Sequence, residues 1–189
     1  MTEPVAAGRQ LSTAELVYIS ICAALLAVCS WISVPAVPPL PPFTMQTFGV
    51  FLILLLLGGR RGFYAVAVFL LLGAAGLPVF SHFTGGVGVL LGTTGGYLLG
   101  FLFTAALYWA LERFTVRRPA LRIAALALGL AVCYAFGTAW FMALYARQSG
   151  AIGLGTALGW CVLPFIVPDL VKLALAWGLG AALKKHIRL

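Results

Sequence analysis

Two oppositely charged residues lie inside a long apolar segment near the end of the chain. Asp169 is the only aspartate, and Lys172 follows it three residues later within the stretch Leu163–Leu183. A charged side chain at the centre of a membrane-spanning helix costs about 2.5–3.5 kcal/mol on insertion scales, so such residues usually pair or face a cavity. Residues at i and i+3 share one helical face. The spacing therefore predicts a small polar binding site, although an ion pair that only joins helices has the same pattern.

Further ligand-contact candidates lie where two predicted loops meet apolar helices. An aromatic residue and two neutral hydrogen-bonding residues follow a proline-rich stretch, which could also be only a rigid connector. A glycine-rich loop that lacks the lysine of a nucleotide-binding motif does not bind a nucleotide phosphate, and we expect it to close against a ligand. The candidates besides the charged pair are Phe43, Thr44, Gln46, Phe80, Thr84, Gly85, Gly86 and Tyr97.

The composition excludes an ordinary soluble domain. Hydrophobic residues make up 63% of the 189 residues and charged residues only 8%, and apolar runs leave no room for a separate globular domain. The net charge of +8 is divided among short clusters, whereas a nucleic-acid site needs a contiguous basic face. The cysteines lack metal-binding spacing, and no catalytic motif is present. We therefore expect no enzyme activity, no metal or cofactor site and no nucleic-acid partner.

Hydropathy and helix-stop signals predict six apolar helices in one transmembrane domain over residues 1–189. The second and third are shorter than the ~20 residues that cross a bilayer, so either neighbouring helices shield them or the adjoining loops dip into the membrane where protein lines them. The last helix is expected to begin at Pro168, which would put Asp169 at the positive end of the helix dipole. The first helix should be retained, because the bulky Val28 precedes Cys29 where processing needs a small residue. The helices are expected at about 14–33, 45–57, 63–76, 95–114, 123–145 and 168–185.

The basic residues fall mainly in alternate loops. Ten of the twelve lie near the chain ends, in a turn over Gly58–Gly62 or at and after the end of the fourth predicted helix, and the exceptions are Arg147 and Lys172. The positive-inside rule then places both termini in the cytoplasm and the remaining loops outside. Asp169 would lie about 23 Å along the helix from Lys184. We therefore expect a multi-pass protein of the plasma membrane, in contact with lipid, whose charged pair is reached from outside.

Two small residues, Ala23 and Ala27, lie one turn apart in the first predicted helix. Small residues at this spacing let membrane helices approach closely. The face they form can pack inside the bundle or receive a partner membrane protein. We predict that it receives the partner. The same spacing recurs at Gly92, Gly96 and Gly100, where we expect close helix packing.

Five segments together resemble the BioY family, the biotin-specific substrate-binding (S) subunits of energy-coupling factor (ECF) transporters. They are PFTMQTF (42–48), LLGGRRG (56–62), LLLGAAGLPVF (70–80), GGVGVLLGTTGGYLLGF (85–101) and LPFIVPDLVK (163–172). Thr93 departs from the proline usual in that family, which removes no ligand group. The resemblance implies an all-α, S-component-like bundle of six membrane helices that captures biotin from the outer side. It also implies a transmembrane coupling subunit and two cytoplasmic ATPase subunits as partners.

The resemblance also implies roles for the candidate residues. Asp169 suits the ureido N–H groups of biotin, and Lys172 suits either the ureido oxygen or the carboxylate. The aromatic residues Phe43, Phe80 and Tyr97 would cover the apolar ring faces. Two other functions stay open, namely an S-component for another vitamin such as riboflavin or thiamine, and a membrane carrier that works without an ATPase. Carriers often contain inverted repeats, and none is evident in this chain.

Overall fold

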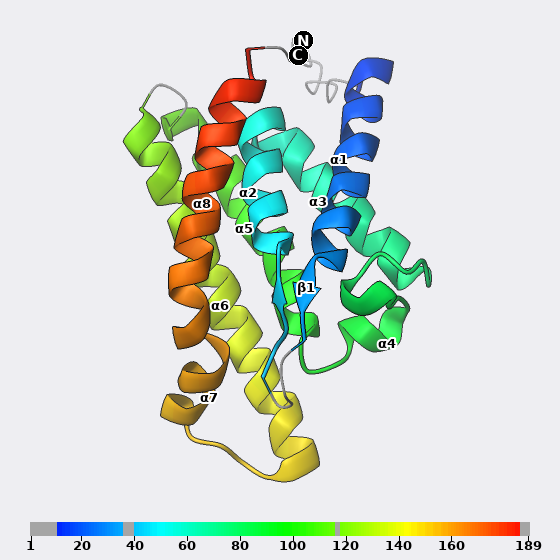
Figure 1. Ribbon diagram of the computed structural model, residues 1–189, viewed down its shortest axis with the longest axis vertical. Coiled ribbons are helices and arrows are strands. Elements are labelled where there is room, and N and C mark those ends of the chain that lie inside the picture. The colour runs from blue at the N-terminus through cyan, green and yellow to red at the C-terminus, as the bar shows by residue number, and fades with distance from the viewer. Residues whose placement is uncertain (1–10, 36–39, 116–117, 186–189) are drawn as a thin grey trace, which may run out of the picture.

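The chain folds into an antiparallel bundle of long helices. The computed structural model describes residues 11–35, 40–115 and 118–185. Helices α1, α3 and α6 run away from the end of the bundle at which α1 begins, and α2, α5 and α8 return to it (Figure 1). The elements are α1 (Thr13–Trp31), β1 (Ser33–Val34), β2 (Phe43–Thr44), α2 (Gln46–Leu57), α3 (Gly59–Ala74), the 3₁₀ turn η1 (Ser81–Phe83), α4 (Val87–Leu90), α5 (Gly95–Thr115), α6 (Pro119–Ser149), α7 (Leu154–Cys161) and α8 (Leu163–Leu183).

Each predicted helix overlaps an observed one, but the helices differ in length. Within the described residues, three helical stretches are long and apolar enough to cross a membrane: α1, α6 and the α7–α8 segment Leu154–Leu183. The short helix α2 is enclosed by its neighbours, because every residue from Gly49 to Leu57 is buried. Such enclosure is what a helix too short to face lipid along its whole length requires. The expectation that other helices shield α2 is confirmed.

Gly58 joins α2 directly to α3. Its φ of 79° lies in the left-handed region that glycine tolerates. Glu112 of α5 accepts the N–H of Gly59 with an N···O distance of 2.9 Å, which satisfies one of the free donors at the start of α3. The expectation of a longer turn is therefore wrong, because Arg60 and Arg61 already lie in the first turn of α3.

A capping box fixes the start of α1. The Ser12 hydroxyl accepts the N–H of Glu15, and the Glu15 carboxylate accepts the N–H of Ser12 at 2.8 Å. The same carboxylate pairs with Arg61, with 2.6 Å between Oε1 and Nη2. The beginning of α1 is thereby tied to the beginning of α3, at the end of the bundle where α5 and α8 terminate (Figure 1).

Glycines bring α5 and α6 into close contact. A Cβ atom on Gly96 would lie 2.4 Å from Cβ of Trp140, and one on Gly100 would lie 3.1 Å from Cα of Cys133. Only a residue without a side chain fits at Gly96, so Gly96 and Gly100 serve helix packing, as expected. Gly92 precedes α5, and a Cβ atom there would meet only backbone atoms of its own segment. Thr104 of α5 adds a hydrogen bond of 2.8 Å to a backbone carbonyl of α6.

Short elements cover the end of the bundle opposite the start of α1. Strands β1 and β2 pair antiparallel, and the glycine-rich segment that was expected to be a loop contains η1 and α4. Trp31 of α1 stacks on Phe83 with ring centroids 5.0 Å apart, and its indole N–H donates to the carbonyl of Pro78 at 2.9 Å. These contacts hold the glycine-rich segment against α1.

Helix α8 begins at Leu163, so Pro168 lies within it and not in its first turn. The expectation that Asp169 lies at the positive end of a helix dipole is therefore wrong. A proline inside a helix leaves the carbonyl four residues earlier without its helical donor, and membrane helices tolerate this where a neighbour or a cavity compensates. The charge of Asp169 is compensated by side chains instead of by a helix terminus.

Candidate functional site

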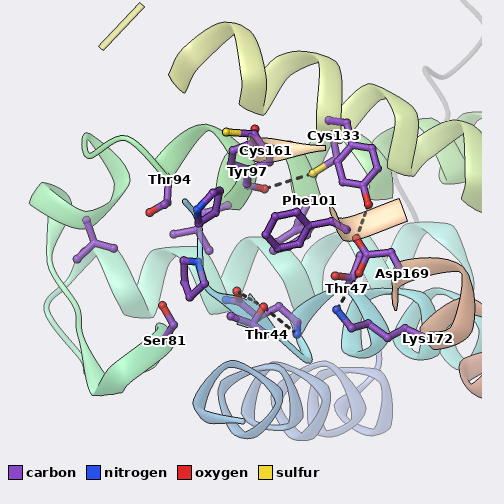
Figure 2. A pocket seen from close by; sticks show the side chains of 17 residues that line it. Thr44, Thr47, Ser81, Thr94, Tyr97, Phe101, Cys133, Cys161, Asp169 and Lys172 are labelled. Atoms are coloured by element: carbon purple, nitrogen blue, oxygen red, sulfur yellow. Dashed lines mark hydrogen bonds and ion pairs between the residues drawn. The ribbon is translucent and has the colours of Figure 1, made fainter. Parts of the chain in front are cut away.

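A pocket of about 700 Å³, counted with its open mouth, lies between β2 and helices α2, α4, α5, α6, α7 and α8. Figure 2 shows side chains from these elements converging on one space, with the charged pair at one side. The lining residues are Pro41, Pro42, Thr44, Gln46, Thr47, Ser81, Val89, Thr94, Tyr97, Leu98, Phe101, Cys133, Tyr134, Cys161, Phe165, Asp169 and Lys172.

Asp169 and Lys172 form the charged part of the pocket. Lys172 Nζ donates to Asp169 Oδ1 at 2.8 Å, and the Tyr134 hydroxyl of α6 donates to Oδ2 at 2.5 Å (Figure 2). Asp169 is 3% exposed and Lys172 is 9% exposed, so solvent ions screen this pair little. Each carboxylate oxygen has one donor and keeps acceptor capacity for a ligand N–H group.

Tyr134 is a pocket residue that the sequence did not single out. It belongs to α6, 35 positions before Asp169 in the chain, and no local motif links the two. The one sequence signal for it is a tyrosine within an apolar helix. A buried tyrosine hydroxyl usually forms a hydrogen bond, so such a residue is expected to have a polar partner. That signal predicts a partner without identifying it.

Neutral hydrogen-bonding groups lie on the α2 side of the pocket. The Thr44 hydroxyl donates to the side-chain carbonyl of Gln46 at 3.0 Å, and the Gln46 amide donates to the Ser30 hydroxyl at 2.8 Å. Gln46 is 6% exposed and Ser30 is fully buried. The network fixes the orientation of Gln46, and both Thr44 and Gln46 line the pocket as predicted.

Aromatic side chains form much of the remaining wall. Phe165 lines the pocket, and Phe43 stacks behind it with ring centroids 4.3 Å apart. The predicted Tyr97 also lines the pocket, and its hydroxyl is 3.0 Å from the Thr138 hydroxyl. Phe101 completes this wall (Figure 2). The wall offers flat apolar faces to a ligand ring.

Five of the predicted contact residues lie outside the lining: Phe43, which stacks on Phe165, and four residues of the glycine-rich segment and the turn before it. Phe80 is 1% exposed and packs edge-on against Phe69. Thr84 donates its hydroxyl to a backbone carbonyl at 2.8 Å. A Cβ atom on Gly85 would lie 2.2 Å from a backbone oxygen, and Gly86 has a φ of 98°. The latter four residues shape the glycine-rich segment, and contact of all five with a ligand stays a prediction.

Ala23 and Ala27 face the interior of the bundle. They are 2% and 6% exposed and belong to the hydrophobic core. The expectation that this face receives a partner protein is therefore corrected, because its small side chains already allow other helices of the same chain to approach. The outer face of α1 is a different set of residues, and it includes Ser20 and Ala24, both exposed.

The pocket is suited to a small organic molecule with polar and apolar parts. It offers one carboxylate, one ammonium group, neutral hydrogen-bonding groups and aromatic walls. Cys133 and Cys161 also line it, and both thiols are free and buried. Within the described part of the chain, no cluster of three or more His, Cys, Asp or Glu side chains could hold a metal ion.

Comparisons with known proteins agree with this description. The model of the BioY family matches residues 3–189. The chain is 40% identical over 172 residues to the biotin transporter BioY of Thermotoga maritima, covering 90% of this chain and 96% of that protein. It is 34% identical over 171 residues to the biotin transporter BioY2 of Lactococcus lactis subsp. cremoris, covering 89% of each. The fold is similar to the crystal structure of the S-component for biotin from an ECF-type ABC transporter, with a TM-score of 0.80 and 25% sequence identity. The match covers 93% of this chain and 95% of that one.

Proposed function

The chain belongs to the BioY family, and we propose that it is the substrate-binding subunit of a biotin uptake transporter, with biotin held beside Asp169 and Lys172. The proteins it is similar to are transporters and not enzymes. The observation that carries the proposal is the buried ion pair that lines the pocket. Its two members provide an acceptor and a donor at a place where a ligand can reach both.

The chemistry of biotin matches the groups in the pocket. Its ureido ring has two N–H donors and one carbonyl, and an ionised carboxylate accepts such donors in charge-assisted hydrogen bonds. Asp169 meets this need, because Lys172 and Tyr134 hold its oxygens in place. Lys172 serves either the ureido oxygen or the carboxylate tail. The thioether ring packs against the aromatic wall formed by Tyr97 and Phe165.

The proposed orientation follows from charge. Six spans with both ends in the cytoplasm would place Arg60, Arg61 and Arg118 on the inner side, as the positive-inside rule requires. The direction of the helices supports this, because α1 begins and α8 ends at the same end of the bundle (Figure 1). The pocket mouth would then open to the outer side of the plasma membrane, where biotin is captured.

Transport requires further subunits. We found no nucleotide-binding motif in the sequence, so the energy for uphill uptake would come from a transmembrane coupling subunit with two cytoplasmic ATPases. The outer face of α1, with the exposed pair Ser20 and Ala24, has the small-residue spacing on which a membrane helix can dock.

Equilibrium binding of labelled biotin to the purified protein tests the proposal. Unlabelled biotin should displace the label, and riboflavin and thiamine should not, because neither carries a cyclic urea with an N–H donor on each side of one carbonyl. Displacement by one of those vitamins at concentrations similar to biotin would favour the alternative of another vitamin. Failure of the folded protein to bind biotin at all would overturn the proposed substrate.

A further inference from the structure

A second pocket lies at the opposite end of the bundle from the biotin pocket. It occupies about 460 Å³, counted with its open mouth, between α2, the first turns of α6 and the last turns of α8. The absence of a side chain at Gly180 and the small side chain of Ala181 leave this space free. The lining residues are Leu55, Arg122, Trp177, Gly180, Ala181 and Lys184.

Two cations, Arg122 and Lys184, share this pocket, and neither is in a direct ion pair found among the described residues. Arg122 Nε is buried and has no hydrogen-bond partner, which is unfavourable for a charged donor. Burial lowers the pKa of Lys184, and the nearby positive charge of Arg122 lowers it further, whereas Glu112 raises it. The like charges of Arg122 and Lys184 therefore act on each other, and an anion between them would relieve the repulsion.

The acidic residues of the described chain are engaged elsewhere. Of the four acidic residues, Asp169 pairs with Lys172, Glu15 pairs with an arginine of α3, and Glu112 accepts a backbone N–H at the start of α3. Glu3 lies outside the described residues. The ion pairs found among the described residues include neither Arg122 nor Lys184. Glu112 acts on Lys184 less strongly than Arg122 does, so an anion from another molecule would complete the compensation of charge.

The surroundings of the pocket are those of a membrane surface. Trp177 lines it, and tryptophan is enriched where a membrane meets water. On the side of the same helix that carries Trp177, Leu170 is 51% exposed and Ala174 and Ala181 are exposed as well, which gives an apolar strip next to the pocket. Basic pockets between helices on the cytoplasmic side of a membrane commonly hold lipid headgroups.

We propose that Arg122 and Lys184 bind the phosphate group of an anionic phospholipid at this pocket. The guanidinium group offers paired donors that match phosphate oxygens, and the ammonium group adds a point charge. The acyl chains lie along the apolar strip of α8. Free phosphate has similar oxygen atoms, but it makes no use of that strip.

Native mass spectrometry of the full-length protein in detergent tests the proposal, with phosphatidylglycerol, phosphatidylcholine and inorganic phosphate as separate probes. The wild type should bind phosphatidylglycerol more tightly than either other probe. Each basic residue near a membrane surface contributes about fivefold, so the double variant Arg122→Gln/Lys184→Gln should lose about 30-fold. Ala181→Leu, which fills the pocket and keeps both charges, should also weaken binding. The matched control Arg113→Gln/Lys185→Gln removes two charges outside the lining at the same end of the bundle and should weaken binding much less than the double variant does, whereas an equal loss would refute a specific site.

Biotin binding provides the folding control, because the second pocket is remote from Asp169 and every variant should retain it. Equal affinity for phosphatidylglycerol and phosphatidylcholine would overturn the proposal. If inorganic phosphate binds as tightly as phosphatidylglycerol, the pocket binds a soluble anion and the lipid proposal is wrong. If no lipid binds and the double variant instead fails to assemble with the coupling subunit, the pocket receives an acidic side chain of that partner and the lipid proposal is wrong.

Discussion

Removing the charge of Asp169 while keeping its shape should weaken both biotin binding and the packing of the bundle. Asp169→Asn deletes the anion that we assign to the ureido N–H groups, and it leaves Lys172, which is 9% exposed, without a counter-charge. A hydrogen bond to a charged group is worth about 1.5–3 kcal/mol, so biotin affinity should fall roughly 10- to 150-fold. An unpaired buried charge costs about 3–5 kcal/mol, so thermal stability should fall as well.

The double variant Asp169→Asn/Lys172→Met distinguishes the two roles. A buried ion pair can be replaced by neutral side chains of similar size with little loss of stability. The double variant should therefore recover much of the thermal stability that Asp169→Asn loses, while biotin binding stays weak. If the pair served only to join helices, recovery of stability would bring recovery of binding.

A second ion pair provides the matched control. Arg61 and Glu15 lie 2.6 Å apart at the other end of the bundle, so Glu15→Gln/Arg61→Met should change thermal stability without changing biotin affinity. The assay is equilibrium binding of labelled biotin to each purified variant, together with its thermal unfolding midpoint. Binding by Asp169→Asn/Lys172→Met at the wild-type level would refute the assignment of the pair as ligand contacts.

Three further predictions concern the site, the topology and the partner. Tyr134→Phe removes a hydrogen bond to a carboxylate and should weaken biotin binding about 10-fold or more, measured by the same assay; unchanged affinity would exclude Tyr134 from positioning the carboxylate. In a background without the four cysteines, a membrane-impermeant thiol reagent should label His82→Cys from outside and Arg118→Cys only from inside, and labelling of both from one side would refute the orientation. Ala24→Trp should prevent co-purification with the coupling subunit and keep biotin binding, whereas Ala23→Trp, forced into the core, should lose both; normal co-purification by Ala24→Trp would remove this face of α1 from the interface.

The positions of the helices could be predicted because apolar runs and charge clusters are local signals. The fourth predicted helix, 95–114, differs from α5 by one residue at its end. Pro168 misled the prediction for α8, because a proline rule for helix starts was applied to a proline that lies inside a helix. In a membrane protein the surrounding helices decide whether such a proline is tolerated, and the sequence does not reveal those neighbours.

The pocket could be predicted only in part. Asp169, Lys172, Thr44, Gln46 and Tyr97 all line it, because polar residues in apolar segments are conspicuous. The glycine-rich segment was less informative, since the same glycines permit backbone turns and close contacts without touching a ligand. The contribution of α6 could not be foreseen, because contacts between distant helices depend on packing and not on local spacing.

The structure of the protein with biotin bound tests the central claim most directly. We predict that biotin occupies the pocket between α2, α5, α6 and α8, with a ureido nitrogen within hydrogen-bond distance of an Asp169 carboxylate oxygen and its ring against Tyr97 or Phe165. Biotin found elsewhere, for example with its carboxylate at Arg122 and Lys184 and the Asp169 pocket empty, would contradict the account.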